Sequence, residues 1–314
     1  MIIYESNYGT TEKIASYLSL ILGPATYCKT SEFKEEYADF DLFVIGSPIY
    51  SGQIVPQIYE FVEKNQKWLK QKNVSLFSTS ISPKDGQKNL DKLEKNLDNV
   101  ISKKALGGTL KIDKLNKMDS KALELFSENL GFNLGDMDHF KLEEVVEYGM
   151  ELKEIKDDLS PNMPPDQIKK MVEEFLSAHN TCTLSTAGGE MVRATPIEYT
   201  YKNGFIYLLS EGGGKFANIL LNKRVSIAVY EDYTGMNNLA GMQISGQAKI
   251  VPPGKTEYGE ILKIKGLSPD FINKLPINLN MVKITLEKVE FLYSAFQEMG
   301  NETKQIFKFD NKSE

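Results

Sequence analysis

Histidine and cysteine are scarce in this sequence. Its 314 residues include only two His, His139 and His179, and two Cys, Cys28 and Cys182. A zinc finger, an iron–sulfur cluster or a di-iron centre each needs more such ligands than this chain supplies. Two Cys so far apart in the sequence do not build a disulfide framework, which is typical of a reducing compartment. We therefore expect no metal site and a cytoplasmic protein.

Long apolar runs and arginine are also missing. No run reaches the roughly 18 apolar residues of a membrane-spanning helix. The first residues, MIIYESNYG, have neither the charged start nor the apolar stretch of a signal peptide. There are two Arg against 35 Lys, and the net charge is −6. Because nucleic-acid binding requires a basic surface, this balance argues against it. We expect neither a membrane nor a nucleic acid as a partner.

The length of the chain predicts about two domains. Residues 1–160 contain 20 Lys and 26 Asp and Glu, so this half carries the whole net charge of −6, and residues 161–314 are neutral. The change falls beside the stretch SPNMPP, and prolines break helices and stiffen linkers. We predict a first domain at 1–158, a Pro-rich linker at 159–165 and a second domain at 166–314.

Strands and helices alternate in the first half. Apolar segments at 1–5, 41–46, 73–79 and 105–110 predict strands, and helices are expected after them, including a lysine-rich one near 87–100. This alternation is typical of an α/β fold with a doubly wound parallel sheet. Ligands bind beyond the carboxyl ends of the strands in such sheets. Three strand ends therefore form one candidate site.

The loops at these strand ends carry residues suited to a flat phosphate-bearing ligand. The first offers the hydroxyls of Ser6, Thr10 and Thr11 beside a helix N-terminus, which favours an anion. Without Lys or Arg it is not a Walker loop. Tyr50 in the second loop could stack on a ring, and Ser80 begins a third loop that could edge it. Such residues also fill ordinary turns, but their presence at three consecutive strand ends favours bound FMN.

The segments SNYGTTEKIA, VIGSPIYSGQIVPQIYEFVEKN and ALGGTLKIDKL resemble the flavodoxin-domain family that includes the flavodoxin-type protoporphyrinogen oxidases. The resemblance covers about residues 1–155, and Tyr8 stands where the family usually has Thr. It implies a flavodoxin-like fold that binds FMN through the three loops. The implied contacts are Ser6, Tyr8, Gly9, Thr10 and Thr11; Pro48, Ile49, Tyr50, Ser51 and Gly52; and Ser78, Thr79 and Ser80.

The spacing of apolar residues changes in the second half of the chain, from alternating strands and helices to mostly strands. A helix expected at 166–178 is followed by short turn-punctuated strands, which predict a mainly β fold such as a small barrel. The stretch EGGGK at residues 211–215 follows a strand and opens a helix. Glycines let backbone approach a ligand closely, and Lys215 would add a cation for a phosphate. Glycine runs also occur in exposed hairpins.

The order FLSAHNTCTLST, GGEMVRATPIEYTY, GFIYLLSEGGGKFANILLNKRVSIAVYE and MQISGQAKIV resembles the split-barrel FMN-binding family of pyridoxamine 5′-phosphate oxidase, over about residues 166–314. The resemblance implies a homodimer formed through this half. It implies FMN contacts at Arg193, Ala194, Thr195, Pro196, Leu209, Ser210 and Lys215. The family usually has Arg before the Lys, whereas Gly214 stands there, so the phosphate clamp lacks one charge.

Two such modules imply up to two FMN per chain. We expect an FMN-dependent flavoprotein oxidoreductase or electron-transfer protein that relays electrons between a reductant such as NAD(P)H and an acceptor. The acidic first half would suit transient docking on a basic patch of a redox partner protein. Two alternatives stay open: a porphyrinogen or haem-related oxidase or dehydrogenase, and a flavin-binding sensor or scaffold without turnover. The sequence identifies no catalytic residue.

Overall fold

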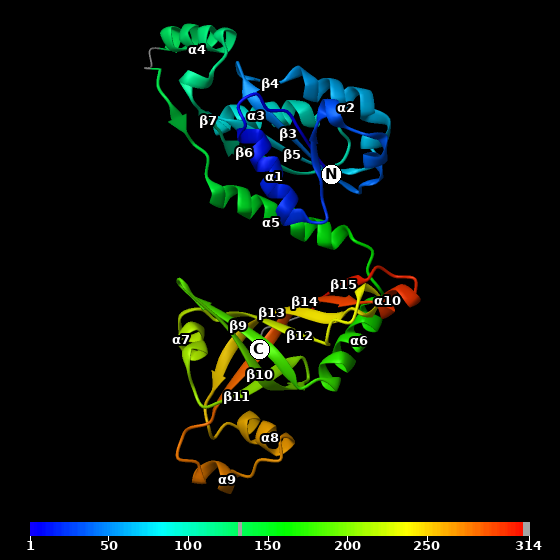
Figure 1. Ribbon diagram of the computed structural model, residues 1–314, viewed down its shortest axis with the longest axis vertical. Helices are drawn as coiled ribbons and strands as arrows, with labels where there is room; N and C mark the ends of the chain where they lie inside the picture. The colour runs from blue at the N-terminus through cyan, green and yellow to red at the C-terminus, as the bar shows by residue number, and fades with distance from the viewer. Residues whose placement is uncertain (131–133, 310–314) are drawn as a thin grey trace. The chain divides into compact units, whose positions relative to one another are not determined.

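The computed structural model describes residues 1–130 and 134–309 (Figure 1). Contacts between residues divide the chain into two compact units, Met1–Ser160 and Pro161–Glu314. This division falls inside the segment that the sequence predicts as a linker. Met163 nevertheless belongs to the second unit, because its side chain is buried in that core and its amide donates to the Gln305 side chain at 2.7 Å.

The first unit is built on a parallel sheet with helices on both faces. Its parallel strands are β1 (Ile2–Tyr4), β2 (Tyr27–Lys29), β3 (Leu42–Tyr50), β5 (Asn73–Ser80) and β6 (Val100–Gly107). The strand order is β2-β1-β3-β5-β6, with the short β4 (Gln53–Ile54) folded back antiparallel onto β3. This is the order of a flavodoxin-like sheet. The parallel α/β architecture expected from the sequence is confirmed.

Alternate residues of each strand face different helices. On one face, α1 (Thr10–Leu22) and α5 (Leu142–Leu159) pack on the side of β1 that carries Ile2 and Tyr4. On the other, α2 (Pro56–Leu69) and α3 (Pro83–Glu94) cover the side that carries Ile3. Because both faces are buried, the inner strands read as continuous apolar runs. The short turns η1 (Thr30–Glu32) and η2 (Glu35–Asp39) connect β2 to β3.

Two expectations about the end of this unit are wrong in their boundaries. The expected helix up to residue 100 ends at Glu94, and the strand expected at 105–110 begins at Val100. β6 lies at the sheet edge and is half-buried along Val100–Ala105, so it lacks the continuous apolar run of the inner strands. Between β6 and α5 the chain makes an excursion that the sequence did not predict: β7 (Thr109–Leu110), η3 (Ile112–Lys114), α4 (Lys117–Leu130) and β8 (Met137–Asp138).

The second unit is an antiparallel barrel entered through α6 (Pro165–Ala178). Its strands are β9 (Thr181–Gly188), β10 (Met191–Lys202), β11 (Phe205–Ser210), β12 (Arg224–Tyr230), β13 (Ala240–Val251), β14 (Asn280–Tyr293) and β15 (Lys304–Lys308). Six of them run β11-β10-β9-β12-β13-β14, and pairing of β11 with β14 closes the barrel, while β15 adds to β14. The closed antiparallel barrel fits the expected split-barrel fold.

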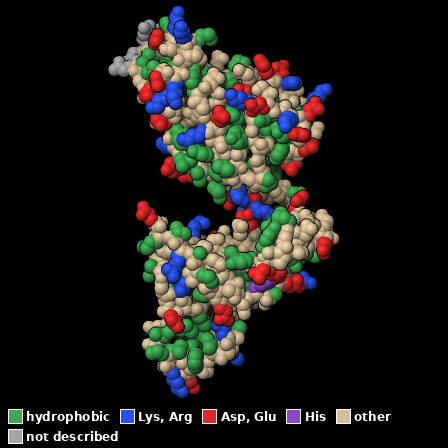
Figure 2. Space-filling model, in the orientation of Figure 1, with side chains coloured by type: hydrophobic (Ala, Val, Ile, Leu, Met, Phe, Trp, Pro, Cys, Tyr) green, Lys and Arg blue, Asp and Glu red, His purple; other side chains and the backbone are tan. Residues whose placement is uncertain are grey.

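Helices occupy three connections of the barrel. The helix α7 (Gly214–Leu221) follows β11 and packs on β9 and β10. The insertion of α8 (Thr256–Ile264) and α9 (Pro269–Lys274) between β13 and β14 has its own apolar cluster, and hydrophobic side chains also gather on its surface (Figure 2). The turn η4 (Met236–Asn238) and the helix α10 (Ala295–Glu298) complete the unit. Within the described residues, no helix is both long enough and apolar enough to cross a membrane.

Candidate functional site

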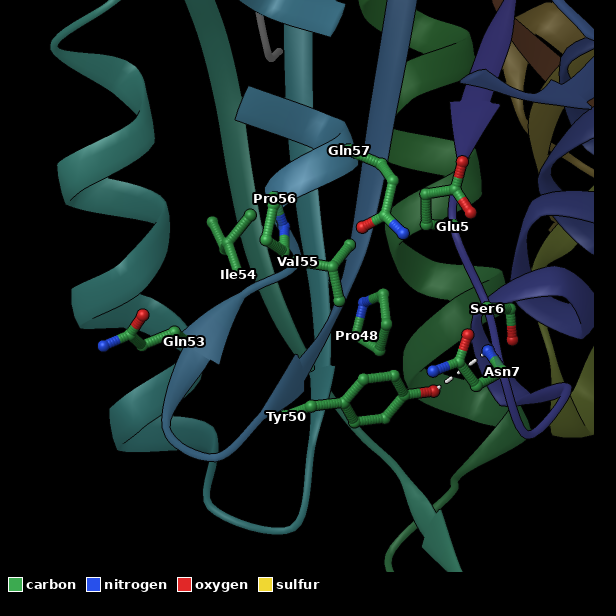
Figure 3. Close-up of a pocket in the computed structure, with 10 residues that line it drawn as sticks. All are labelled: Glu5, Ser6, Asn7, Pro48, Tyr50, Gln53, Ile54, Val55, Pro56 and Gln57. Carbon is green, nitrogen blue, oxygen red and sulfur yellow. Dashed lines mark hydrogen bonds between the residues drawn. The ribbon is translucent and has the colours of Figure 1, made fainter. Parts of the chain in front are cut away.

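The first candidate site lies where the strand order reverses, between β1 and β3. The chain leaves β1 toward α1 and leaves β3 toward α2, on opposite faces, so the carboxyl ends of these strands border a crevice. A pocket of about 260 Å³ occupies this position (Figure 3). Its lining residues are Glu5, Ser6, Asn7, Pro48, Tyr50, Gln53, Ile54, Val55, Pro56 and Gln57.

The loop after β1 has the form of an anion cradle. Gly9 has φ of 91°, a left-handed conformation that glycine adopts without strain, and α1 begins at the next residue. The Gly9 amide donates to the Ser6 hydroxyl at 2.9 Å. Among the described residues no side chain caps α1. Amides of the first turn, beside the half-buried Thr10, are therefore available to an anion.

Two tyrosines link this loop to its neighbours. The Asn7 amide donates to the Tyr50 hydroxyl at 3.1 Å (Figure 3). The rings of Tyr8 and Tyr50 meet edge-on with centroids 5.5 Å apart. The Tyr8 hydroxyl donates to the Asp119 carboxylate of α4 and lies 3.1 Å from the Asn116 amide nitrogen. Burial and the hydrogen bond to Asp119 raise the pKa of Tyr8 to about 12. Tyr8 therefore connects the loop after β1 to the segment that carries α4.

The carboxyl-terminal end of β5 lies beneath the surface, whereas the loop that follows it is half-buried at Ile81 and exposed at Ser82. Ser78, Thr79 and Ser80 are all buried, and the Ser80 hydroxyl donates to the Ser82 carbonyl at 2.6 Å. A Cβ placed on Gly86 of α3 would stand 2.7 Å from the Ser78 hydroxyl oxygen, which has no hydrogen-bond partner within the described chain. Ser78 thus faces α3. Thr79 instead bonds to the first loop, because its hydroxyl lies 2.8 Å from that of Thr11.

The predicted residues of the second loop divide between the pocket and a hairpin. Pro48 and Tyr50 line the pocket, whereas Ser51 and Gly52 form the exposed β3–β4 turn with φ of 48° and 74°. Ile49 pairs with Ile54 across that hairpin. Sequence reasoning missed the pocket residues Glu5, Asn7 and 53–57. In the sequence, only their position next to the predicted loops points to these residues.

The second candidate site lies at the start of α7 in the barrel. Gly212 and Gly213 have φ of 144° and 106°, conformations that disfavour side chains. Lys215 is only 8% exposed, and its Nζ donates to the Gly212 carbonyl at 2.6 Å. Burial, reinforced by the nearby Arg193 cation, lowers the pKa of Lys215. At the end of β11, the Ser210 hydroxyl accepts a hydrogen bond from the Gly212 amide at 3.3 Å.

Strand β10 contributes the other polar groups of this site. Arg193 and Thr195 are two residues apart and lie on one face of the strand. The Arg193 Nη1 atom stands 3.4 Å from the position of a Cβ on Gly214, so its guanidinium lies against the first residue of α7. The Thr195 hydroxyl is buried and has no hydrogen-bond partner in the described part of the chain. Two cations and an unpartnered hydroxyl therefore come from adjacent elements.

The helix α7 is held in place by a residue that sequence reasoning missed. Asn218 is buried, and its Nδ2 donates at 3.1 Å to both the carbonyl and the hydroxyl of Thr186 in β9. Its signal in the sequence is a lone amide inside the apolar stretch FANILL. The other residues implied by the resemblance lie elsewhere: Ala194 and Pro196 are exposed, and Leu209 packs against the cluster under α8.

Both sites suit a phosphate ester better than a metal. Within residues 1–130 and 134–309, no group of three or more His, Cys, Asp and Glu side chains could hold a metal ion. The residues of the barrel site fit FMN on two observations: the glycine cradle at α7 and the unpartnered Thr195 hydroxyl. The first site offers a neutral cradle and an aromatic ring at Tyr50.

Two family models match the chain, one in each unit. The model described as flavodoxin domain matches residues 1–129, and the model described as pyridoxamine 5′-phosphate oxidase matches residues 168–293. No curated protein matches the chain.

Solved structures with partial similarity include three from bacteria. An FAD-binding protein of Mesorhizobium loti is 20% identical, with 38% of this chain and 89% of that chain covered and a TM-score of 0.29. The heme storage protein HutZ of Vibrio cholerae is 16% identical, with 40% and 96% covered and a TM-score of 0.33. Campylobacter jejuni ChuZ is 17% identical, with 56% and 73% covered and a TM-score of 0.37. Because these TM-scores are low, the domain assignment depends on the family models.

Proposed function

The chain joins an N-terminal flavodoxin domain to a C-terminal pyridoxamine 5′-phosphate oxidase domain, and from this premise we propose that it is an FMN-dependent redox protein. The observation that carries the proposal is the approach of Arg193 to the start of α7, where Lys215 is buried, with the unpartnered Thr195 hydroxyl two residues along the same face of β10. We place the domains at 1–158 and 166–314 with the linker at 159–165, since the compact units divide between Ser160 and Pro161; the end of this linker, at Met163, packs into the second domain.

In the barrel, the two cations would bind the phosphate of FMN. Arg193 and Lys215 approach α7 from β10 and from the helix itself, and the helix N-terminus adds partial positive charge. The Thr195 hydroxyl would hydrogen-bond a polar atom of the ligand, which would relieve the cost of its burial. Asn218 would keep α7 and therefore Lys215 in position. Bound FMN supplies hydride and single-electron transfer.

In the flavodoxin unit, the phosphate would lie in a neutral cradle. Ser6, Gly9, Thr10 and Thr11 supply hydroxyls and helix amides without a Lys or Arg in the loop. Tyr50 would offer a ring or a hydroxyl to the flavin at the pocket. Two sites of different charge in one chain support an electron relay, in which NAD(P)H would bind directly over one flavin and an acceptor protein would dock on the acidic first unit.

The barrel would form a homodimer. Val192, Ala194 and Pro196 alternate with Arg193 and lie exposed on the opposite face of β10, with Val192 81% exposed. On α7, residues 220 and 221 are Leu and are 74% and 70% exposed. Exposed apolar surface of this kind marks interaction sites. A second copy of the chain, as the resemblance implies, would bury it.

Anaerobic reduction tests the redox function. The purified full chain, reconstituted with FMN, is mixed with NADH or NADPH without oxygen, and the flavin absorbance is followed. We expect bleaching, then recovery of the oxidised spectrum when an electron acceptor is added. Flavin that binds but is not reduced by either nucleotide, or by protoporphyrinogen as a second donor, would favour a sensor or scaffold. Reduction by protoporphyrinogen alone would favour the porphyrinogen oxidase.

A further inference from the structure

The helix α5 presents a row of apolar side chains to solvent. Its buried side packs on α1 and on the sheet. Leu142, Val146 and Met150 are 46%, 42% and 50% exposed and follow one another at intervals of four residues. Residues at this spacing stand on one face of a helix. Hydrophobic side chains are visible over α1 and α5 on the first unit (Figure 2). We call these three residues the α5 row.

A second row on the same helix is acidic. Successive residues of a helix are about 100° apart around its axis, so residues 143, 147, 151 and 154 share one sector beside the α5 row. All four are exposed Glu. Glu151 accepts a hydrogen bond from the Ser102 hydroxyl at 2.9 Å. Within residues 1–130 and 134–309, the carboxylates of Glu143, Glu147 and Glu154 form no ion pair or hydrogen bond.

The α5 row begins at the edge of the sheet where the proposed flavin site of the first unit lies. Ahead of α5, the His139 amide donates to the Gly108 carbonyl at 3.0 Å, just beyond the end of β6. The Lys13 ammonium of α1 lies 4.1 Å from the centroid of the Phe140 ring. The start of α5 is therefore near the start of α1, which carries the anion cradle.

The chemistry of the two rows distinguishes between possible occupants. The helix carries seven acidic residues and two lysines. A second α5, an anionic lipid surface or a nucleic acid would therefore be repelled, whereas a basic protein surface would be attracted. The α5 row is a narrow ridge of about 12 Å between residues 142 and 150, at about 1.5 Å per residue. Ridges of this spacing are the surfaces on which another helix packs.

We propose that α5 is the docking site for a partner protein that presents a basic amphipathic helix. The apolar side of that helix would cover Leu142, Val146 and Met150. Its Lys or Arg side chains would lie against Glu143 and Glu147. Because the α5 row begins at the flavin edge, this partner would be the electron acceptor. The identity of the partner as acceptor rests on the proposed redox function, whereas the docking does not.

Peptide binding tests the docking without any flavin. The probe has 18 residues, the length of α5, and consists of Leu on one helical face and Lys elsewhere. A second peptide has the same composition, with its Leu distributed around the helix. Binding of each labelled peptide to the full chain is followed by fluorescence anisotropy at about 0.05 M salt, where charges are weakly screened. We expect the amphipathic peptide to bind at least about 10-fold more tightly.

Two variants of α5 test the two rows separately. Val146→Gln/Met150→Gln removes apolar surface and should weaken binding of the amphipathic peptide about 10-fold. Glu143→Lys/Glu147→Lys replaces attraction by repulsion and should weaken it about 10- to 30-fold. All four residues are exposed, so the core of the first unit is left intact.

Two matched controls make the same kinds of change elsewhere. Glu60→Lys/Glu63→Lys gives the same net charge on α2, which covers the other face of the sheet. Ile264→Gln removes an apolar side chain that is 55% exposed at the end of α8. Each should change peptide affinity less than about threefold. Equal binding of the two peptides, or an equal loss in the two Glu→Lys variants, would overturn the docking site, because net charge alone would explain either result.

Electron transfer to cytochrome c, a basic protein that accepts one electron, tests the identity of the partner. The full chain is loaded with FMN and reduced without excess reductant, and the absorbance of cytochrome c is followed. We expect Glu143→Lys/Glu147→Lys to slow its reduction at least about fivefold relative to Glu60→Lys/Glu63→Lys. Equal rates would overturn the acceptor as the occupant of α5. A chain that binds no FMN would reject the proposed redox function, while the peptide result would still decide the docking.

Discussion

The hydroxyl groups of Thr11 in α1 and Thr79 in β5 lie 2.8 Å apart and share a buried hydrogen bond. The two residues are 1% and 5% exposed, so neither hydroxyl can exchange its partner for bulk water. This bond joins the first turn of α1 to the carboxyl-terminal end of β5. The position of the anion cradle after β1 therefore depends on the end of β5, which lies two strands away in the sheet.

Removing one side of this bond should destabilise the first unit. Thr11→Val leaves the Thr79 hydroxyl buried without a partner, and we expect the free energy of unfolding to fall by about 1–3 kcal/mol. Thr11→Val/Thr79→Val removes both hydroxyls and should cost less than the single change. Urea unfolding followed by the fluorescence of Trp68, the only tryptophan, reports on this unit alone. A double variant less stable than the single one would contradict this account of the bond.

FMN affinity should depend on salt concentration more strongly at the barrel site than at the first site. The barrel clamp has two cations, whereas the first cradle has none in its loop. Raising the salt concentration from about 0.05 M to about 0.5 M screens charge–charge attraction. FMN binding by the Thr10→Glu chain, which retains the barrel site, should therefore weaken several-fold more than FMN binding by Lys215→Ala, which retains the first site. Equal salt dependence would argue against the cationic clamp.

The barrel site should also lose FMN at alkaline pH. Burial and Arg193 lower the pKa of Lys215 below its ordinary value of 10.5. As pH rises through that lowered pKa, free Lys215 loses its proton and its attraction for phosphate, so FMN affinity should start to fall below pH 10.5. Riboflavin affinity should not follow. Lys215→Arg keeps its charge over this range and should flatten the profile; a steep profile in this variant would assign the titration to another group.

A charge on the exposed apolar face of β10 should dissociate the dimer. Val192→Glu places a carboxylate where Val192 is 81% exposed, and light scattering should show the 35.4 kDa monomer in place of a two-chain species. Leu20→Glu makes the same kind of change at a residue of the first unit that is 77% exposed. It should leave the dimer intact. A wild-type chain that is already monomeric would reject this interface.

The central strands and the glycine loops are predictable from sequence because each depends on local chemistry. Apolar runs such as 41–46 are buried on both faces of a parallel sheet, and Gly9 and Gly213 sit where the backbone needs positive φ. The boundary between α3 and β6 was misplaced because the edge strand is half-buried and carries lysines that fit a helix equally well. The insertion of α8 and α9 is built from helices of nine and six residues, which give weak periodic signals.

Side-chain partnerships between distant segments were not predictable. The partner of Tyr8 is Asp119, 111 residues further on, so its hydroxyl could not be assigned to the excursion from the loop sequence. Gly214 indicated a missing charge in the clamp. Only the packing of α7 on β10 brings Arg193, 21 positions earlier in the sequence, into the space that Gly214 leaves open. The sequence therefore predicts which residue types form the site, but not which of them are in contact.

The number of FMN molecules bound per chain decides whether both units are flavin sites. The full chain is reconstituted with FMN, freed of excess ligand and denatured, and the released flavin is quantified against protein and identified by chromatography. We expect two FMN per wild-type chain and one each in Thr10→Glu and Lys215→Ala, with the double variant empty. A wild-type chain that releases no FMN, or single variants that still release two, would contradict this expectation.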